Sequence, residues 1–172
     1  MRKSLILLSA LSLLPLASCG FEPIYAKKQG VPSGETAYLQ SALNKVSIAN
    51  IPDQEGVILR NELIDRFYVA GRPETAFYKL DVLPIREIRR ELDITVGAEA
   101  TRAQLEIIVP FVLTDILTGE VLLRARAETF ASFNIIADEY ATRVSERRTR
   151  ENALRDIARQ IEQKTAFTLD RL

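Results

Sequence analysis

The single cysteine of this 172-residue chain, Cys19, follows a short apolar run, and this arrangement limits how the chain can fold. The run covers residues 5–16 after a basic start, and Ala17 and Ser18 separate it from the cysteine. This three-part pattern is typical of a signal peptide. Because a spanning helix needs about 20 apolar residues, the run is too short for a membrane anchor. We therefore expect residues 1–18 to be removed, leaving a chain that packing alone stabilises, with no internal disulfide.

Residues 16–19, Leu-Ala-Ser-Cys, meet every position of the bacterial lipobox, at which a signal peptide is cut and its cysteine is lipidated. We interpret Cys19 as the site of a covalent diacylglycerol and an N-acyl chain, and we expect no other cofactor. Two or more acyl chains hold a protein stably on a membrane. The alternative is an ordinary secretory peptide with an unmodified cysteine. Resemblance to other lipoprotein signals implies that Gly20, in place of an aspartate, directs the chain to the outer membrane.

The remaining residues, 19–172, are enough for one domain with its own core. Loss of Arg2 and Lys3 leaves 21 basic and 23 acidic residues, a formal charge of −2. Such a chain has no overall field that would draw it to nucleic acid. Prolines and glycines in residues 19–41 predict an extended leash after the lipid. Residues 42–172 then form a single α+β domain.

The first half of this domain predicts a strand and a helix. Residues 43–51 form the strand, which Pro52 ends. Asp53 is a candidate cap for a helix that runs to about Ala70, with Gly71 as its stop. The apolar stripe expected on this helix consists of Val57, Leu59, Leu63, Ile64 and Phe67.

Three strand-like runs follow. Residues 76–96 have β-rich ends around Pro84, where we expect a bulge or a break. Residues 105–117 are so apolar that a strand buried on both faces, or one beneath a helix, is expected, with Pro110 at a bulge or unpaired edge. After a turn at 115–119, residues 121–133 alternate between small apolar side chains and charged ones.

The last helix is expected to begin at a cap on Asp138 and to run towards the C-terminus. Its second half carries an apolar stripe: Leu154, Ile157, Ala158, Ile161, Thr165, Thr168 and Leu169. Residues 145–152 are polar on every side, so this part either projects or is held by ion pairs, such as Glu146–Arg150 and Glu151–Arg155. The predicted fold is α+β, in the order β-α-β-β-β-α: a four-stranded mixed sheet with two helices on one face.

Catalytic chemistry is absent from the sequence. The chain has no histidine, which removes a Ser-His-Asp triad, a Cys-His pair and most zinc sites. There is no phosphate-binding glycine motif, and neighbouring acids such as Glu91 and Asp93 are common on solvated surfaces. We therefore expect no catalytic, metal or cofactor-binding residues.

Four arginines are candidate contacts. Arg86 and Arg90 share one face if their strand is regular, and Arg124 and Arg126 share one as well. The arginine fork suits phosphate and carboxylate, so this surface can bind an anionic partner. The alternative is a solvated sheet face with its charge balanced by neighbouring glutamates.

The segment Cys19-Gly-Phe-Glu-Pro-Ile-Tyr25 resembles the mature start of the LptE-type lipopolysaccharide-assembly lipoproteins. The predicted element order and the long C-terminal helix are similar to that family too. The resemblance implies an outer-membrane lipoprotein that lies inside an LptD-type β-barrel on the periplasmic side. There it would plug the barrel, assist its assembly and contact lipopolysaccharide, with Arg86, Arg90, Arg124 and Arg126 as candidate contacts. A charged surface without catalytic groups is compatible with the polar interior of a large barrel.

Two other hypotheses share the lipid anchor. The first is a periplasm-facing auxiliary lipoprotein of a transport system, or a pilot for a secretin. The second is a lipoprotein hydrolase, which the missing chemistry disfavours.

Overall fold

A computed structural model describes residues 34–69, 71–94 and 100–172 of the chain. Cys19 and the segment Gly20–Tyr25 lie outside the described residues, so their predicted roles stay predictions. Among the helices that are described, none combines the length and apolar character needed to cross a membrane. The elements are α2 (Gly34–Leu43), β1 (Val46–Ile48), α3 (Asp53–Phe67), β2 (Tyr78–Val82), β3 (Arg86–Ile94), β4 (Ala100–Asp115), β5 (Val121–Asn134) and α4 (Glu139–Leu169).

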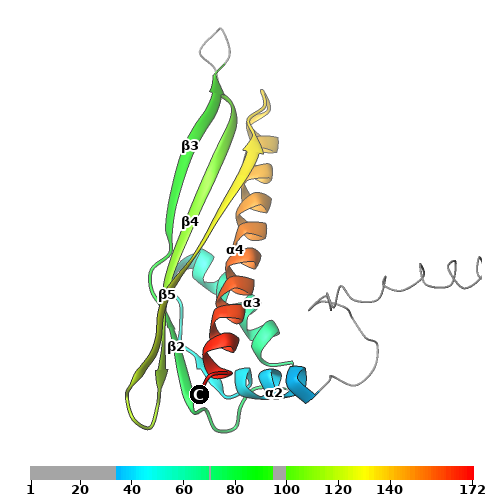
Figure 1. The fold of residues 1–172 in the computed structure, drawn as a ribbon. Coiled ribbons are helices and arrows are strands. Elements are labelled where there is room, and N and C mark those ends of the chain that lie inside the picture. Colours follow the sequence, from blue (N-terminus) through cyan, green and yellow to red (C-terminus); the bar gives the residue numbers. More distant parts are fainter. Residues whose placement is uncertain (1–33, 70, 95–99) are drawn as a thin grey trace, which may run out of the picture. The chain divides into compact units, whose positions relative to one another are not determined.

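The predicted α+β class is confirmed, with a mixed sheet and with α3 and α4 on one of its faces (Figure 1). The described residues contain five strands and three helices, against the predicted four and two. The extra strand arises because the run 76–96 is divided into β2 and β3. The extra helix is α2, and the expectation of an extended chain over residues 34–41 was wrong. The prolines and glycines that suggested it end at Gly34, and the following residues are mostly good helix formers.

Contacts with α3 hold α2 and β1 in place. The Gln40 side-chain amide of α2 donates to the carbonyl oxygens of Arg66 and Phe67, which the end of α3 leaves without helical partners. The Tyr68 hydroxyl donates to the Val46 carbonyl, 2.8 Å away, and accepts from the Ile48 amide. These bonds give hydrogen-bond partners to backbone groups of Val46 and Ile48 in the short strand β1.

Helix α3 forms as predicted, with three corrections. Leu59, Leu63 and Phe67 are buried, but Val57 is 54% exposed and Ile58 packs against the core in its place. Pro52, not Asp53, holds the N-cap position. The helix ends at Phe67 rather than Ala70, and Gly71 follows in the left-handed region, with φ of 103°.

A one-residue bulge joins β2 and β3 along the same edge of β4. Val82 pairs with Phe111 and Arg86 pairs with Ile108, so three residues, 83–85, stand opposite two of β4. Pro84 lies in the bulge, as predicted. Pro110 pairs with Arg126 of β5, and on its other side it lies opposite the bulge, where its carbonyl accepts from the Leu83 amide at 2.9 Å. The irregular pairing at the bulge accommodates a residue that has no amide hydrogen to donate.

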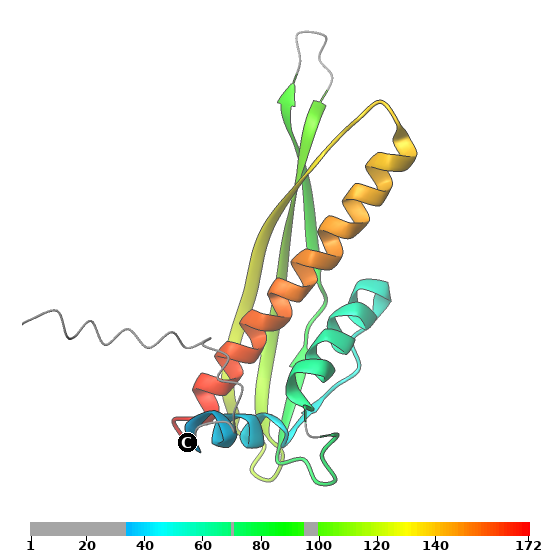
Figure 2. The ribbon, with the colours of Figure 1, turned by 90° about the vertical axis from the view of Figure 1, so that its right-hand side faces the viewer.

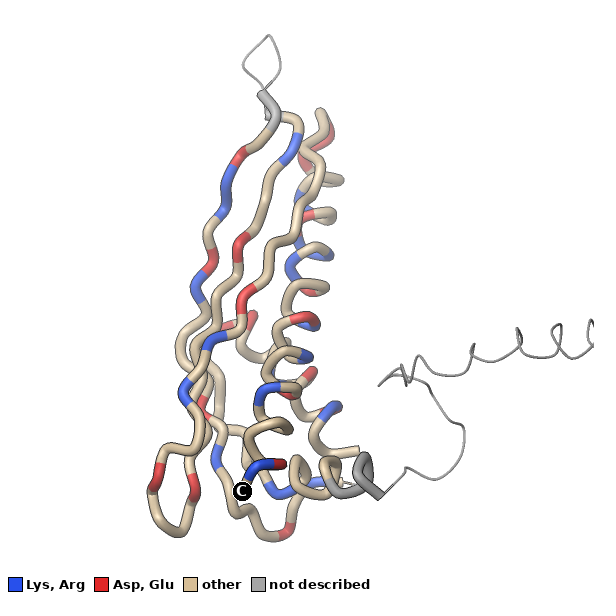
Figure 3. Tube along the Cα trace, in the orientation of Figure 1, with Lys and Arg blue, Asp and Glu red and all other residues tan. Residues whose placement is uncertain are grey.

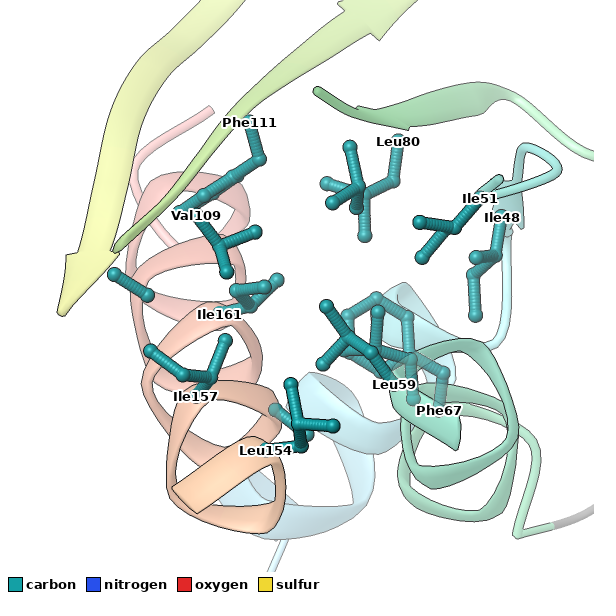
Figure 4. Close-up of a cluster of buried hydrophobic side chains, with 14 of the residues drawn as sticks. Ile48, Ile51, Leu59, Phe67, Leu80, Val109, Phe111, Leu154, Ile157 and Ile161 are labelled. Carbon is teal, nitrogen blue, oxygen red and sulfur yellow. The ribbon is translucent and has the colours of Figure 1, made fainter. Parts of the chain in front are cut away.

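Helix α4 packs over β4 and β5, and α3 lies beside it (Figures 1 and 2). The odd-numbered residues of β4 from Ala103 to Leu113 are buried beneath these helices. Figure 4 shows how Leu59 and Phe67 of α3 and Leu154, Ile157 and Ile161 of α4 converge on the sheet. The predicted cap is confirmed, because Asp138 accepts from the Ala141 amide at 3.1 Å. None of the described helices covers the other side of the sheet (Figure 1).

The outer edge of β5 is closed by side chains of α4. The Gln160 amide bonds both the N–H and the carbonyl of Glu128, at 3.2 and 2.9 Å. The Lys164 ammonium donates to the Arg126 carbonyl at 2.6 Å. These contacts occupy backbone groups through which another strand could pair.

Candidate functional site

The candidate site is the sheet surface that faces away from the helices, here called the open sheet face. Strand pairing determines its members, because directly paired residues point to the same side of a sheet. Arg86, Ile108 and Glu128 form one row across β3, β4 and β5. The charged residues of the open sheet face are Lys79, Asp81, Arg86, Arg90, Arg102, Glu106, Arg124, Arg126 and Glu128.

All four predicted arginines lie on the open sheet face. Arg86 and Arg90 share it on β3, and Arg124 and Arg126 share it on β5, as the two-residue period of each strand predicted. The structure adds that the two pairs lie on the same side of the sheet. Figure 3 shows basic residues along both outer strands, with acidic residues between them.

Two of the four arginines are paired with carboxylates and two are not. Arg90 contacts Glu106 at 2.9 Å, and the Glu106 side chain is only 12% exposed. Arg126 lies 3.6 Å from Glu128. Among the described residues, Arg86 and Arg124 have no carboxylate within 4.0 Å. The positive charge available to a ligand therefore lies at Arg86 and Arg124, on opposite edges of β4.

Apolar side chains occupy the space between these charges. Ile108, Pro110 and Val112 follow one another on the open face of β4, each half-buried. Ile88 flanks them on β3, and Phe130 on β5 is 54% exposed. A surface with an apolar centre and arginines at its edges can contact a molecule that is both phosphorylated and apolar.

Several members of this surface were missed by sequence reasoning. The apolar residues Ile88 and Ile108 and the charged residues Lys79 and Arg102 were not singled out. Alternation within β4 identifies Ile108, because its neighbours in the sequence, Ile107 and Val109, point to the core. Lys79 and Arg102 needed the strand pairing, since neither sits in an arginine cluster.

The polar half of α4 is held by ion pairs. Arg150 donates to Glu87 of β3 and, at 2.9 Å, to Glu146, so the predicted pair Glu146–Arg150 is confirmed. The hydrogen bond to Glu87 raises the pKa of Arg150 further above its ordinary value. The predicted pair Glu151–Arg155 is wrong: Arg155 instead contacts Glu62 of α3, at 3.1 Å.

Neither a metal site nor an enclosed pocket stands out in the part of the chain that is described. No group of three or more Asp, Glu, His or Cys side chains in these residues could hold a metal ion. A shallow hollow of about 440 Å³ runs along the first half of α4. Its lining consists of residues of that one helix: Tyr140, Ala141, Val144, Ser145, Arg148, Thr149 and Asn152.

Three of the solved structures with a similar fold are lipoproteins. A lipoprotein from Caulobacter crescentus CB15 matches with a TM-score of 0.63 and 21% identity, over 78% of this chain and 97% of its own. The rare lipoprotein B from Shewanella oneidensis matches with a TM-score of 0.59 and 14% identity, over 74% and 96%. A minor lipoprotein from Acinetobacter baumannii matches with 0.52 and 18%, over 74% and 90%. At these identities the likeness shows the fold alone.

The family comparison reaches further than the structural one. The family described as "LptE: Lipopolysaccharide-assembly" matches residues 43–165, from the end of α2 through most of α4. A search of curated proteins found no match. The matched range includes the whole described part of the open sheet face, and it covers more than half of the chain. The chain belongs to the LptE family of lipopolysaccharide-assembly proteins.

Proposed function

We propose that this chain is tethered by lipid on Cys19 and sits inside an LptD-type outer-membrane β-barrel. It plugs the barrel, assists its assembly and takes part in the delivery of lipopolysaccharide to the cell surface. Large barrels enclose a polar, water-filled interior. A plug for such an interior needs a charged surface on a rigid domain, and the open sheet face and the polar half of α4 supply one.

The observation that carries the proposal is the composition of the open sheet face. Lipopolysaccharide combines phosphate groups with acyl chains. Arg86 and Arg124 offer unpaired guanidinium groups for phosphate, and Ile108 and Val112 lie between them as an apolar strip. Contact with lipopolysaccharide by Arg86, Arg90, Arg124 and Arg126 is therefore part of the proposal.

The direct test is affinity purification of the tagged, full-length chain from detergent-solubilised outer membranes. We expect one large β-barrel protein to copurify in stoichiometric amount. A Cys19→Ser chain tests the tether separately, because without the barrel it should not float with phospholipid vesicles, whereas the lipidated chain should. Purification of the wild-type chain without a barrel would overturn the proposal.

Depletion of the protein distinguishes this role from that of an auxiliary transport lipoprotein or secretin pilot. Loss of lipopolysaccharide from the cell surface is the expected result. Intact surface lipopolysaccharide together with a secretion or transport defect would favour the other role. Family membership argues against that role.

A further inference from the structure

We propose that the end of the domain formed by α2, residues 69 and 71–77, the β4–β5 hairpin and the last turn of α4 rests directly on a lipid bilayer. We call this surface the apolar end. The inference rests on the proposed lipidation of Cys19, and it adds a second, protein-based contact with the membrane at the mouth of the barrel, where this end of the domain leaves the lumen. The elements lie together at the end of the domain opposite the start of α4 (Figures 1 and 2).

Exposed apolar side chains gather at this end. Of the twelve large hydrophobic residues that are exposed in the described part of the chain, seven lie here: Val69, Phe77, Ile116, Leu117, Val121, Phe167 and Leu172. Leu117 is 92% exposed, the highest value among the twelve. Single exposed apolar residues need no explanation, but a gathering of this kind marks a protein or membrane contact.

The tip of the β4–β5 hairpin holds Ile116 and Leu117 outward on a fixed backbone. The Asp115 carboxylate accepts from the amides of Leu117 and Thr118, both at 2.8 Å. Gly119 adopts a φ of 74° and donates to the Asp115 carbonyl, and the Ile116 amide donates to Phe77. The apolar tip is thus built into the turn and linked to the neighbouring loop.

Cations accompany the aromatic rings of the apolar end. The Lys45 ammonium lies 5.4 Å from the centre of the Phe77 ring, and the Arg171 guanidinium lies 4.0 Å from that of Phe167. Apolar and aromatic side chains with basic neighbours are typical of surfaces that sit at the boundary between lipid headgroups and acyl chains.

The position of the tether favours a bilayer over another protein as the partner. Residues 20–33 separate Cys19 from α2, which begins at the apolar end. The opposite end lies about 50 Å away along the 16 residues of β4. A lipid on Cys19 is connected to the domain through α2. It therefore draws the apolar end towards the membrane before any other surface.

The test places a lipid-sensitive fluorophore on each end of the full-length, lipidated protein. Because Cys19 is acylated, a Leu117→Cys variant carries one free thiol for a bimane label, and Ile136→Cys provides the matched control. Ile136 is also an exposed apolar residue, at 52%, but it lies near the start of α4. Both proteins are reconstituted into phospholipid vesicles that contain nitroxide-labelled lipids, and circular dichroism checks their folds.

We expect the label at Leu117 to be quenched by the nitroxide lipids at least several-fold more than the label at Ile136. A label at Leu117 that stays unquenched, on protein that floats with the vesicles and copurifies with the barrel, would overturn this inference and leave the proposed function standing. Protection of Leu117 from a water-soluble quencher only when the barrel is present would assign the apolar end to the barrel instead. Protein that does not float would refute the tether on which both depend.

Discussion

The Arg150 guanidinium of α4 donates two hydrogen bonds to the Glu87 carboxylate of β3, from Nε at 2.8 Å and from Nη2 at 2.7 Å. The two residues are 63 positions apart. Their side chains are 22% and 26% exposed, and Glu146 adds a third bond at 2.9 Å. This two-point contact joins the polar half of α4 to the outer strand of the sheet, where α3 does not reach (Figure 2).

Replacement of Arg150 by Met should lower the free energy of unfolding by about 1–3 kcal/mol, because it leaves Glu87 and Glu146 half-buried without their cation. Chemical denaturation measures the change. Arg155→Met is the matched control: its contact with Glu62 is more exposed, at 52% for the arginine, and should contribute less than about 1 kcal/mol. Equal losses in the two variants would show that the Glu87 contact has no special weight.

Charge reversal on the open sheet face should weaken binding of lipopolysaccharide. Arg86→Glu with Arg124→Glu should lower the affinity by about tenfold or more, since each removes an unpaired partner for phosphate. The double variant Arg124→Glu and Arg126→Glu should also lower the affinity, but by less, because Arg126 is already near Glu128.

The control for these variants is Arg143→Glu with Arg159→Glu, which makes the same change in net charge on exposed positions of α4. Binding to immobilised lipopolysaccharide is measured for each folded variant. Unchanged affinity in the Arg86 and Arg124 variant, or an equal loss in the control, would assign the open sheet face to the barrel wall or to solvent.

The hairpin tip should respond to acid through Asp115. The hydrogen bond from the Thr118 amide, with a further one from Leu117, holds the pKa of Asp115 below the ordinary aspartate value of 3.8. The carboxylate therefore stabilises the turn fully above pH of about 4, and this contribution is lost as the pH falls through the lowered pKa. The Thr118 amide resonance should report the transition in an NMR titration.

An Asp115→Ala variant should abolish that transition and speed amide exchange at Leu117 and Thr118 at neutral pH. The Gly119 amide is the internal control, since it donates to the Asp115 main-chain carbonyl and not to the carboxylate. A Thr118 midpoint at or above 3.8 would contradict the role given to this hydrogen bond.

Gly56 should not tolerate a larger residue. A Cβ atom there would lie 2.8 Å from Ile51 Cγ2 and 2.9 Å from the Ile51 carbonyl carbon and oxygen. We expect Gly56→Ala to destabilise the domain by about 1–3 kcal/mol, although alanine is the better helix former. Val57→Ala, at the exposed neighbouring position, should change stability by no more than about 0.5 kcal/mol. A Gly56→Ala protein as stable as wild type would mean that Ile51 moves aside easily.

Periodic segments were predictable because repetition alone determines which side chains share a face. The stripes of α3 and α4 and the alternation of β5 appear in the structure nearly as expected. The predictions that were wrong concern features that contacts between residues far apart in the sequence determine. Arg155 contacts Glu62 of α3 and not Glu151 of its own helix. Helix α2 lies beside the end of α3, where the Gln40 side chain donates to a main-chain carbonyl.

The sequence by itself determined the lipobox pattern and the two long helices. It also determined that Arg86 and Arg90 lie on the same face of their strand, and that Arg124 and Arg126 lie on the same face of theirs. Only the tertiary structure decided that both pairs lie on the same face. In β2 the even-numbered residues Leu80 and Val82 point to the core, so an unbroken strand would turn Arg86 and Arg90 inward as well. The extra residue in the bulge at 83–85 reverses the alternation. Pro84 predicted where the irregularity lies, but the number of extra residues depends on the pairing with β4, which no local pattern in residues 76–96 contains.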